Sequence, residues 1–203
     1  MQEKKTLVVN LFGAPGSGKS TAAAYIFALL KMAGINAELV TEFAKDKVWE
    51  EAKAAFENQQ YLFGEQSYRM SRCMGKVDVI VTDSPLLLSV IYNPKPDIIF
   101  NNWVKLTHLS QFRLNYYINR VNPFVQSGRI HDEFESVLIG ERIKDLLNET
   151  DIEYTEINST KEDYEKVANE IINSMKTDDE RCEEIANKIA KAIKATEFKV
   201  IEL

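Results

Sequence analysis

A glycine-rich segment near the N-terminus has the composition of a phosphate-binding loop. Residues 13–20 read GAPGSGKS and match the pattern G-x-x-x-x-G-K-[ST] at every fixed position. Glycines let the main chain approach a phosphate closely, and the N–H groups of the loop attract anions. We expect Lys19 to reach the β- and γ-phosphates of ATP, and Ser20 to bind Mg²⁺ through its hydroxyl. The residues predicted to hold the nucleotide are Gly13, Ala14, Pro15, Gly16, Ser17, Gly18, Lys19, Ser20 and Thr21.

Two carboxylates follow the second and third predicted strands. Asp83 ends the run 77–83 (VDVIVTD), and a carboxylate at such a strand end can hold the magnesium shell of a nucleotide. The alternative is that Asp83 caps the turn at Ser84 and Pro85. Glu42 follows the strand predicted at 36–41, and a carboxylate there could take the proton from an acceptor hydroxyl. The alternative for Glu42 is an entry position of the next helix.

Arginines occur where positive charge would be needed for phosphoryl transfer. Arg120 and Arg129 flank a Pro- and Gly-containing loop, which predicts a lid at about 120–131 that neutralises the transferred phosphoryl group. Exposed surface charge is the alternative for each. Arg69 and Arg72 lie three residues apart on one predicted helix face and favour an acidic acceptor, whereas Glu42 favours a hydroxyl. The sequence leaves both kinds of acceptor open.

Alternating strands and helices must position these residues. Strands are predicted at 6–12, 36–41, 77–83, 114–121 and 153–158. Helices are predicted at 19–32, 47–73 (in two pieces), 97–112 and 131–149, and from a capping box at Ser159 and Glu162 to Met175. This alternation predicts a three-layer α/β fold with a five-stranded, mostly parallel sheet, helices on both faces and a small lid. Ligands of such sheets bind beyond the carboxyl ends of the strands, where the candidate residues fall.

The composition predicts one globular domain of residues 1–176, followed by a short C-terminal segment. The chain has 203 residues, of which 45% are hydrophobic and 28% charged. Residues 177–203 carry an isoleucine stripe (Ile185, Ile189, Ile193) and a run that predicts an edge strand. We expect this segment to pack on the same domain, with a homodimer contact as the alternative.

Charge, cysteine content and hydropathy exclude several classes of partner. The net charge of −6 argues against a broad basic surface for nucleic acid. Cys73 and Cys182 are far apart and outside any metal-binding pattern, so neither zinc nor a disulfide framework is expected. No apolar run is long enough to cross a membrane, and we expect a cytoplasmic protein.

Absent motifs narrow the class of nucleotide-binding protein. The chain lacks the N-K-x-D sequence that reads guanine, and residues 83–86 (DSPL) lack the glycine of a D-x-x-G switch. It also lacks the glycine-rich signature of transport ATPases, and it is short for a ring-forming motor ATPase with a helical lid domain. These absences favour the compact class that moves a phosphoryl group to a small acceptor.

Four further segments in fixed order carry a family resemblance. After the phosphate loop come 41–45 (TEFAK), 60–66 (QYLFGEQ), 82–85 (TDSP) and the stretch from Arg120 to Arg129. Over residues 6–170 the chain resembles the P-loop nucleoside/nucleotide kinases, in particular a phage-encoded branch labelled as AAA-type ATPases. It is similar to the nicotinamide-riboside kinase domain of bacterial NAD regulators and, more loosely, to deoxynucleoside kinases. A phage origin would place the protein in the host cytoplasm.

The resemblance implies roles for particular residues. Glu42 takes the place of the acid that accepts the proton of the acceptor hydroxyl in deoxynucleoside kinases. Gln59 or Gln66 would read a base, and Phe43, Phe63 or Tyr68 would stack on it, with core packing as the alternative for each aromatic ring. The implied substrate-binding residues are Glu42, Phe43, Gln66, Arg69 and Arg72. The strand-end acid of that group is followed by an arginine, which residues 83–85 (DSP) lack.

Three functions remain in view. The first is a Mg-ATP-dependent kinase of a nucleoside or nucleoside monophosphate. The second is a kinase of hydroxymethyl-pyrimidine bases, such as 5-hydroxymethyluracil, in phage DNA, with the hydroxymethyl group as the acceptor for Glu42. The third is a nucleotide-switched ATPase module without a small acceptor.

Overall fold

The computed structural model of the chain describes residues 5–95, 97–127 and 130–175. The helix and edge strand predicted within 177–203, and Arg129 of the predicted lid, lie outside these residues. The chain divides into a unit Met1–Ala168, which contains the whole sheet and the site, and a second unit that begins at Asn169. In the described part of the chain, no helix is both long and apolar enough to span a bilayer.

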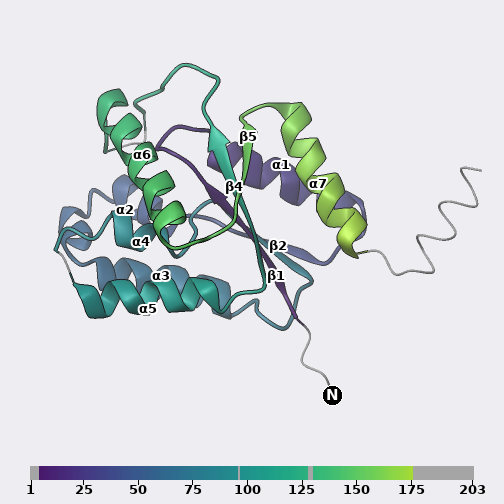
Figure 1. Cartoon of the computed structure of the whole chain (residues 1–203), viewed down its shortest axis with the longest axis horizontal. Coiled ribbons are helices and arrows are strands. Elements are labelled where there is room, and N and C mark those ends of the chain that lie inside the picture. The colour runs from purple at the N-terminus through teal and green to yellow at the C-terminus, as the bar shows by residue number, and fades with distance from the viewer. Residues whose placement is uncertain (1–4, 96, 128–129, 176–203) are drawn as a thin grey trace, which may run out of the picture. The chain divides into compact units, whose positions relative to one another are not determined.

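Five parallel strands form one sheet in the order β2-β3-β1-β4-β5 (Figure 1). This confirms the α/β fold and the five-stranded sheet predicted from the sequence, and every strand pairing in the described chain is parallel. The strands are β1 (Leu7–Phe12), β2 (Ala37–Val40), β3 (Val79–Thr82), β4 (Arg113–Asn119) and β5 (Thr155–Asn158).

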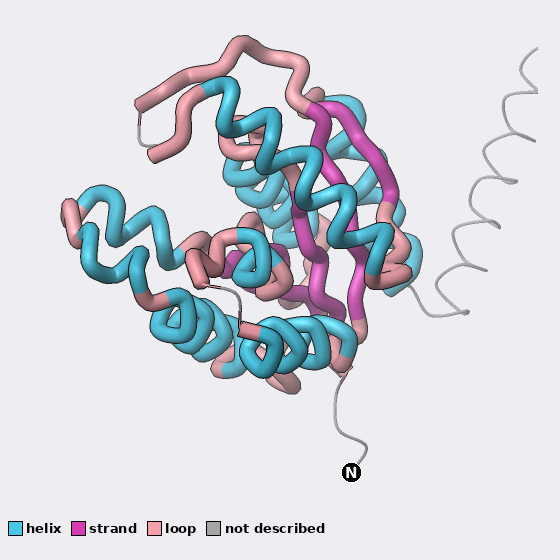
Figure 2. The backbone as a smooth tube through the Cα atoms, turned by 60° about the vertical axis from the view of Figure 1, so that its left-hand side comes forward, coloured by secondary structure: helices cyan, strands magenta, loops and turns pink. Residues whose placement is uncertain are grey.

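Helices connect the strands and cover both faces of the sheet (Figure 2). Phe12, Leu87, Tyr117 and Ile143 share one apolar cluster, and Val8, Phe63, Ile80 and Val104 share another. These clusters place α3 to α6 on one face, while α1 lies on the opposite face. The helices are α1 (Lys19–Met32), α2 (Phe43–Trp49), α3 (Gln59–Ser71), α4 (Leu88–Ile91), α5 (Ile98–Leu109), α6 (Glu133–Glu149) and α7 (Lys161–Met175), with a 3-10 turn η1 (Lys53–Glu57).

The central strand β1 aims the phosphate loop at the carboxyl edge of the sheet. All six of its residues are buried, because β3 and β4 pair with it on either side and helices cover both faces. Val9 lies opposite Val81 of β3 and Leu114 of β4. Residue 13 therefore leaves the sheet between the ends of its neighbours, where Asp83 also emerges.

Three helix starts differ from the predictions. The helix that was predicted to begin at Lys47 begins at Phe43, directly after Glu42. α6 begins at Glu133 rather than His131, because Asp132 and Glu135 form a capping box. At α7 the predicted cap Ser159 is wrong: Thr160 Oγ1 accepts from Asp163 N at 3.3 Å, and Ser159 Oγ accepts from Val121 N instead.

Candidate functional site

The phosphate loop requires glycine at its first position. Gly13 has φ 143°, and a Cβ atom there would lie 2.5 Å from Ser17 Oγ and 2.8 Å from the carbonyl oxygen of Ile118. A side chain would therefore displace both the loop and β4. The loop is thus held close against the sheet edge.

Lys19 and the start of α1 give the loop its positive charge. Lys19 Nζ donates to the carbonyl oxygens of Gly13 and Ala14, at 2.8 and 2.9 Å. α1 begins at Lys19, and no side chain caps its first N–H groups. An uncapped helix start beside a lysine ammonium is an arrangement that binds phosphate.

Helix α6 supports the phosphate loop from outside, which the sequence patterns did not predict. Ser136 Oγ donates to the carbonyl oxygen of Pro15 at 2.6 Å. Gly140, one turn further, leaves room for the loop, because a Cβ there would lie 3.1 Å from Ala14 Cβ and 3.0 Å from Tyr117 Oη. The small residues of α6 thus allow a close approach between the helix and the loop.

We expect Ser136→Ala to weaken nucleotide binding, since the carbonyl of Pro15 loses its donor. Loss of a partner by a buried carbonyl costs about 1–3 kcal/mol, and Pro15 is half-buried, so we expect the lower end of this range, a rise in the KM for ATP and a fall in the melting temperature. Ser110→Ala is the control, because Ser110 Oγ makes a similar bond to Thr107 O on the exposed side of α5. Equal KM values for ATP in both variants would show that the bond to Pro15 does not position the loop.

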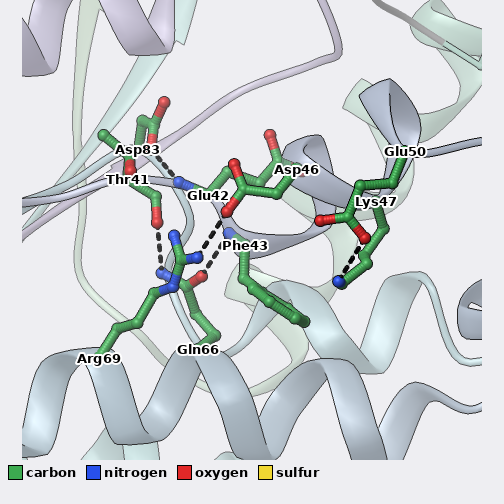
Figure 3. Close-up of polar contacts among 9 residues, drawn as sticks. All are labelled: Thr41, Glu42, Phe43, Asp46, Lys47, Glu50, Gln66, Arg69 and Asp83. Carbon is green, nitrogen blue, oxygen red and sulfur yellow. Dashed lines mark hydrogen bonds and ion pairs between the residues drawn. The ribbon is translucent and has the colours of Figure 1, made fainter. Parts of the chain in front are cut away.

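Asp83 and Glu42 face the phosphate loop across one cavity of about 380 Å³. Asp83 is 4% exposed at the end of β3, and its Oδ1 accepts from the backbone N–H of Glu42 at 3.0 Å (Figure 3). Lys19 and Ser20 line the same cavity. Burial raises the pKa of Glu42; the charge of Lys19 opposes that shift, and the charge of Asp83 adds to it.

Gln66 fixes the turn that carries Glu42. Its Oε1 accepts from Phe43 N at 2.8 Å, and its Nε2 donates to Thr41 O at 3.3 Å, so one amide binds the backbone on both sides of Glu42 (Figure 3). The side chain is 5% exposed and lines the cavity. Gln66 therefore holds Glu42 in place, a role not predicted from the sequence.

We expect Gln66→Met to lower both stability and turnover. Two backbone groups would lose their partner, at about 1–3 kcal/mol each, and Glu42 would no longer be held. Thermal unfolding and steady-state kinetics check this, with Gln60→Met as the control on the exposed side of the same helix. A variant with wild-type kcat and a lower melting temperature would restrict Gln66 to a structural role.

Phe43 and Arg69 stabilise the β2–α2 turn rather than line the cavity. The buried Phe43 ring lies under the guanidinium of Arg69 at 4.9 Å and the ammonium of Lys47 at 5.1 Å. Arg69 also forms an ion pair with Asp46 (Figure 3). Arg72 is exposed at the C-terminal cap of α3 and does not line the cavity either.

The other predicted base-binding residues lie in different surroundings. Phe63 is buried against Phe100 and Trp103, and Tyr68 is largely exposed; neither lines the cavity. Gln59 does line it, and so do Tyr92 and Lys45, for which no role was predicted from the sequence.

The loop predicted to be a lid contributes three residues to the cavity wall. Ser127, Ile130 and His131 line the cavity, and the rings of His131 and Tyr92 lie 5.9 Å apart. Arg120 donates to Glu133 Oε1 at 2.8 Å, lies 5.2 Å over the Phe124 ring and is not in the wall. The start of this loop is therefore tied to the first turn of α6.

A second cavity, of about 310 Å³, adjoins the other side of the phosphate loop. Gly18 lines both cavities, so the loop lies between them. The remaining lining residues come from α1, the loop after β4, the β5–α7 connection and the start of α7: Thr21, Tyr25, Asn122, Ser159, Lys161 and Tyr164.

The donor set fits a magnesium ion bound together with a nucleotide. The Ser20 hydroxyl and the Asp83 carboxylate line one cavity, and oxygen ligands suit Mg²⁺. Within the described residues, no three His, Cys, Asp or Glu side chains gather into a metal site. Phosphate oxygens and water would have to complete the coordination, as is usual for Mg²⁺.

The fold and the site define a P-loop nucleotide-binding protein with the fold of P-loop kinases. The chain belongs to a family described as "AAA domain", whose model matches residues 8–166. A comparison with curated protein sequences gave no match.

The solved structures that share this fold include the following two. One is thymidylate kinase from Ehrlichia chaffeensis, with a TM-score of 0.54 and 13% identity over 85% of this chain and 100% of the other. The second is NadR protein in complex with NR, with a TM-score of 0.54 and 18% identity over 75% of this chain. The match covers 45% of the NadR chain. At these identities the likeness concerns the fold.

Proposed function

We propose that the protein is an ATP-dependent phosphotransferase acting on a nucleoside or nucleoside monophosphate. One observation carries the proposal: the phosphate loop with Lys19 and two strand-end carboxylates, Glu42 and Asp83, line a single cavity. A site that only binds ATP needs the loop and the magnesium ligands. The additional space beyond Glu42, walled by α2 and α3, is suited to a second substrate.

The two cavities can be divided between donor and acceptor. The phosphates of ATP would lie along residues 13–20, and the second cavity, beside Thr21 and Tyr164, would take its adenosine part. The acceptor would enter the first cavity, so that its reacting oxygen meets the γ-phosphate near Lys19. Solved proteins of the same fold include a thymidylate kinase, which supports this class of acceptor.

Each charged group then has a function in the transfer. Lys19 would neutralise charge on the β- and γ-phosphates, and Ser20 and Asp83 would hold Mg²⁺. When bound, Mg²⁺ supplies positive charge to the phosphate oxygens. Arg120 and Arg129 of the lid would add charge as the lid closes over the phosphates. Glu42, two residues after the end of β2, would orient the acceptor, and its backbone N–H is bound to Asp83.

A mass-spectrometric acceptor screen tests this function. The protein is incubated with Mg-ATP and a panel of nucleosides, nucleoside monophosphates, nicotinamide riboside and DNA containing 5-hydroxymethyluracil. We expect a mass gain of one phosphate on a small nucleoside or nucleotide, absent with Lys19→Ala. Phosphorylation of the DNA alone would show that the acceptor is a DNA base and not a small nucleoside or nucleotide.

A further inference from the structure

The cavity wall beyond the phosphate loop has a charge pattern that discriminates between acceptors. Glu42 and Asp83 contribute two carboxylates. Lys19 and Lys45 are the only lysine or arginine side chains among the described lining residues. Lys19 is bound to the phosphate loop through Gly13 and Ala14, which leaves Lys45, an exposed residue, at the acceptor end.

The nearby guanidinium groups have other partners. Arg69 pairs with Asp46 and lies over Phe43, and Arg142 donates to the carbonyl oxygen of Ile91 at 3.0 Å. An acceptor phosphate carries close to two negative charges at neutral pH and is ordinarily bound by bidentate arginines. The described residues of the acceptor end supply no such pair.

The far wall suits an uncharged, flat molecule. Val48, Phe56, Leu62 and Leu88 line it with apolar surface. Gln59 is 6% exposed and lines this wall. Its side-chain amide offers both a donor and an acceptor, which is the pairing that the edge of a nucleobase requires.

From this wall we infer that the acceptor is a nucleoside reacting through a neutral hydroxyl, not a nucleoside monophosphate reacting through its phosphate. The inference rests on the proposed phosphotransferase function. The hydroxyl oxygen forms a bond to the γ-phosphorus of ATP, the bond from that phosphorus to the β–γ bridging oxygen breaks, and ADP leaves with the electron pair. The hydroxyl proton passes to the Glu42 carboxylate. A phosphate acceptor at the same place would set its charge against Glu42, the carboxylate that is not assigned to Mg²⁺.

The test compares matched pairs with Mg-ATP: each nucleoside with its own 5′-monophosphate, and nicotinamide riboside with its mononucleotide. Since like-charge juxtaposition costs several kcal/mol, we expect kcat/KM to favour the nucleoside of the best pair at least about 100-fold. Preference for the monophosphate would overturn the inference and leave the phosphotransferase function intact. Phosphate on neither member of any pair would instead contradict the phosphotransferase function for this panel, and the inference with it.

The variant Arg69→Met tests whether the Arg69 guanidinium stabilises the fold or binds the acceptor. We expect this variant to melt at a lower temperature, because the ion pair with Asp46 and the contact with Phe43 are lost. Its ratio of nucleoside to monophosphate kcat/KM should stay within about twofold of wild type. A selective rise of about tenfold in KM for monophosphates would assign Arg69 to an acceptor phosphate and overturn the inference.

Discussion

Lys19→Ala is expected to reduce kcat/KM for phosphoryl transfer by about 10³-fold or more, because loss of a charged group at the transferred phosphate removes transition-state stabilisation. Lys19 Nζ also donates to the carbonyl oxygens of Gly13 and Ala14, so the loop loses an internal contact as well. Steady-state kinetics and ATP titration of the purified variant measure both effects.

The control is Lys31→Ala, in the last turn of the same helix and exposed. It removes the same charge from α1 at a distance from the phosphate loop, and surface substitutions of this kind change stability by about 0.5 kcal/mol or less. Wild-type activity in Lys19→Ala, or an equal loss in Lys31→Ala, would show that the phosphate loop does not act on the transferred group.

Glu42→Gln is expected to lower kcat by about 10²–10⁴-fold, the usual contribution of a positioned general base. Burial raises the pKa of Glu42 above its ordinary value of 4.5. The wild-type rate should therefore rise with pH until Glu42 is ionised and then level off, and the variant should lose this rise. Glu38→Gln, on the exposed side of β2, is the matched control.

The same substitution should stabilise the fold at neutral pH. A raised pKa in the folded state means that folding favours the protonated form of Glu42, so its contribution to stability is present at low pH and lost as pH rises through the folded-state pKa. Gln mimics the protonated form. We expect Glu42→Gln to melt above wild type at pH 7–8, with a difference that shrinks toward pH 4.5. A variant that is less stable at neutral pH would contradict the buried position of this carboxylate.

The sheet and the phosphate loop were predictable because their signals are local. A mostly apolar run that ends at Phe12, the GAPGSGKS motif and the start of α1 at Lys19 follow one another in the chain. The parallel sheet then brings residues 42 and 83 to the same edge, since the carboxyl ends of parallel strands meet there.

Residues that act across long sequence separations could not be predicted in this way. Ser136 contacts Pro15 from 121 positions away, and no pattern in either segment indicates that pairing. Gln66 and Arg69 have polar side chains, which were predicted from the sequence to bind a substrate. Their partners, the Thr41–Phe43 backbone and Asp46, become neighbours only through the packing of α3 against α2.

The most direct test of the account compares ADP formation with acceptor phosphorylation in one reaction. Using an acceptor found by the screen, both products are quantified over time with Mg-ATP, with and without the acceptor. The account predicts one ADP for each phosphorylated acceptor and a large fall in ADP formation when the acceptor is omitted. ADP formation at the same rate without any acceptor would contradict it and indicate a nucleotide-switched ATPase.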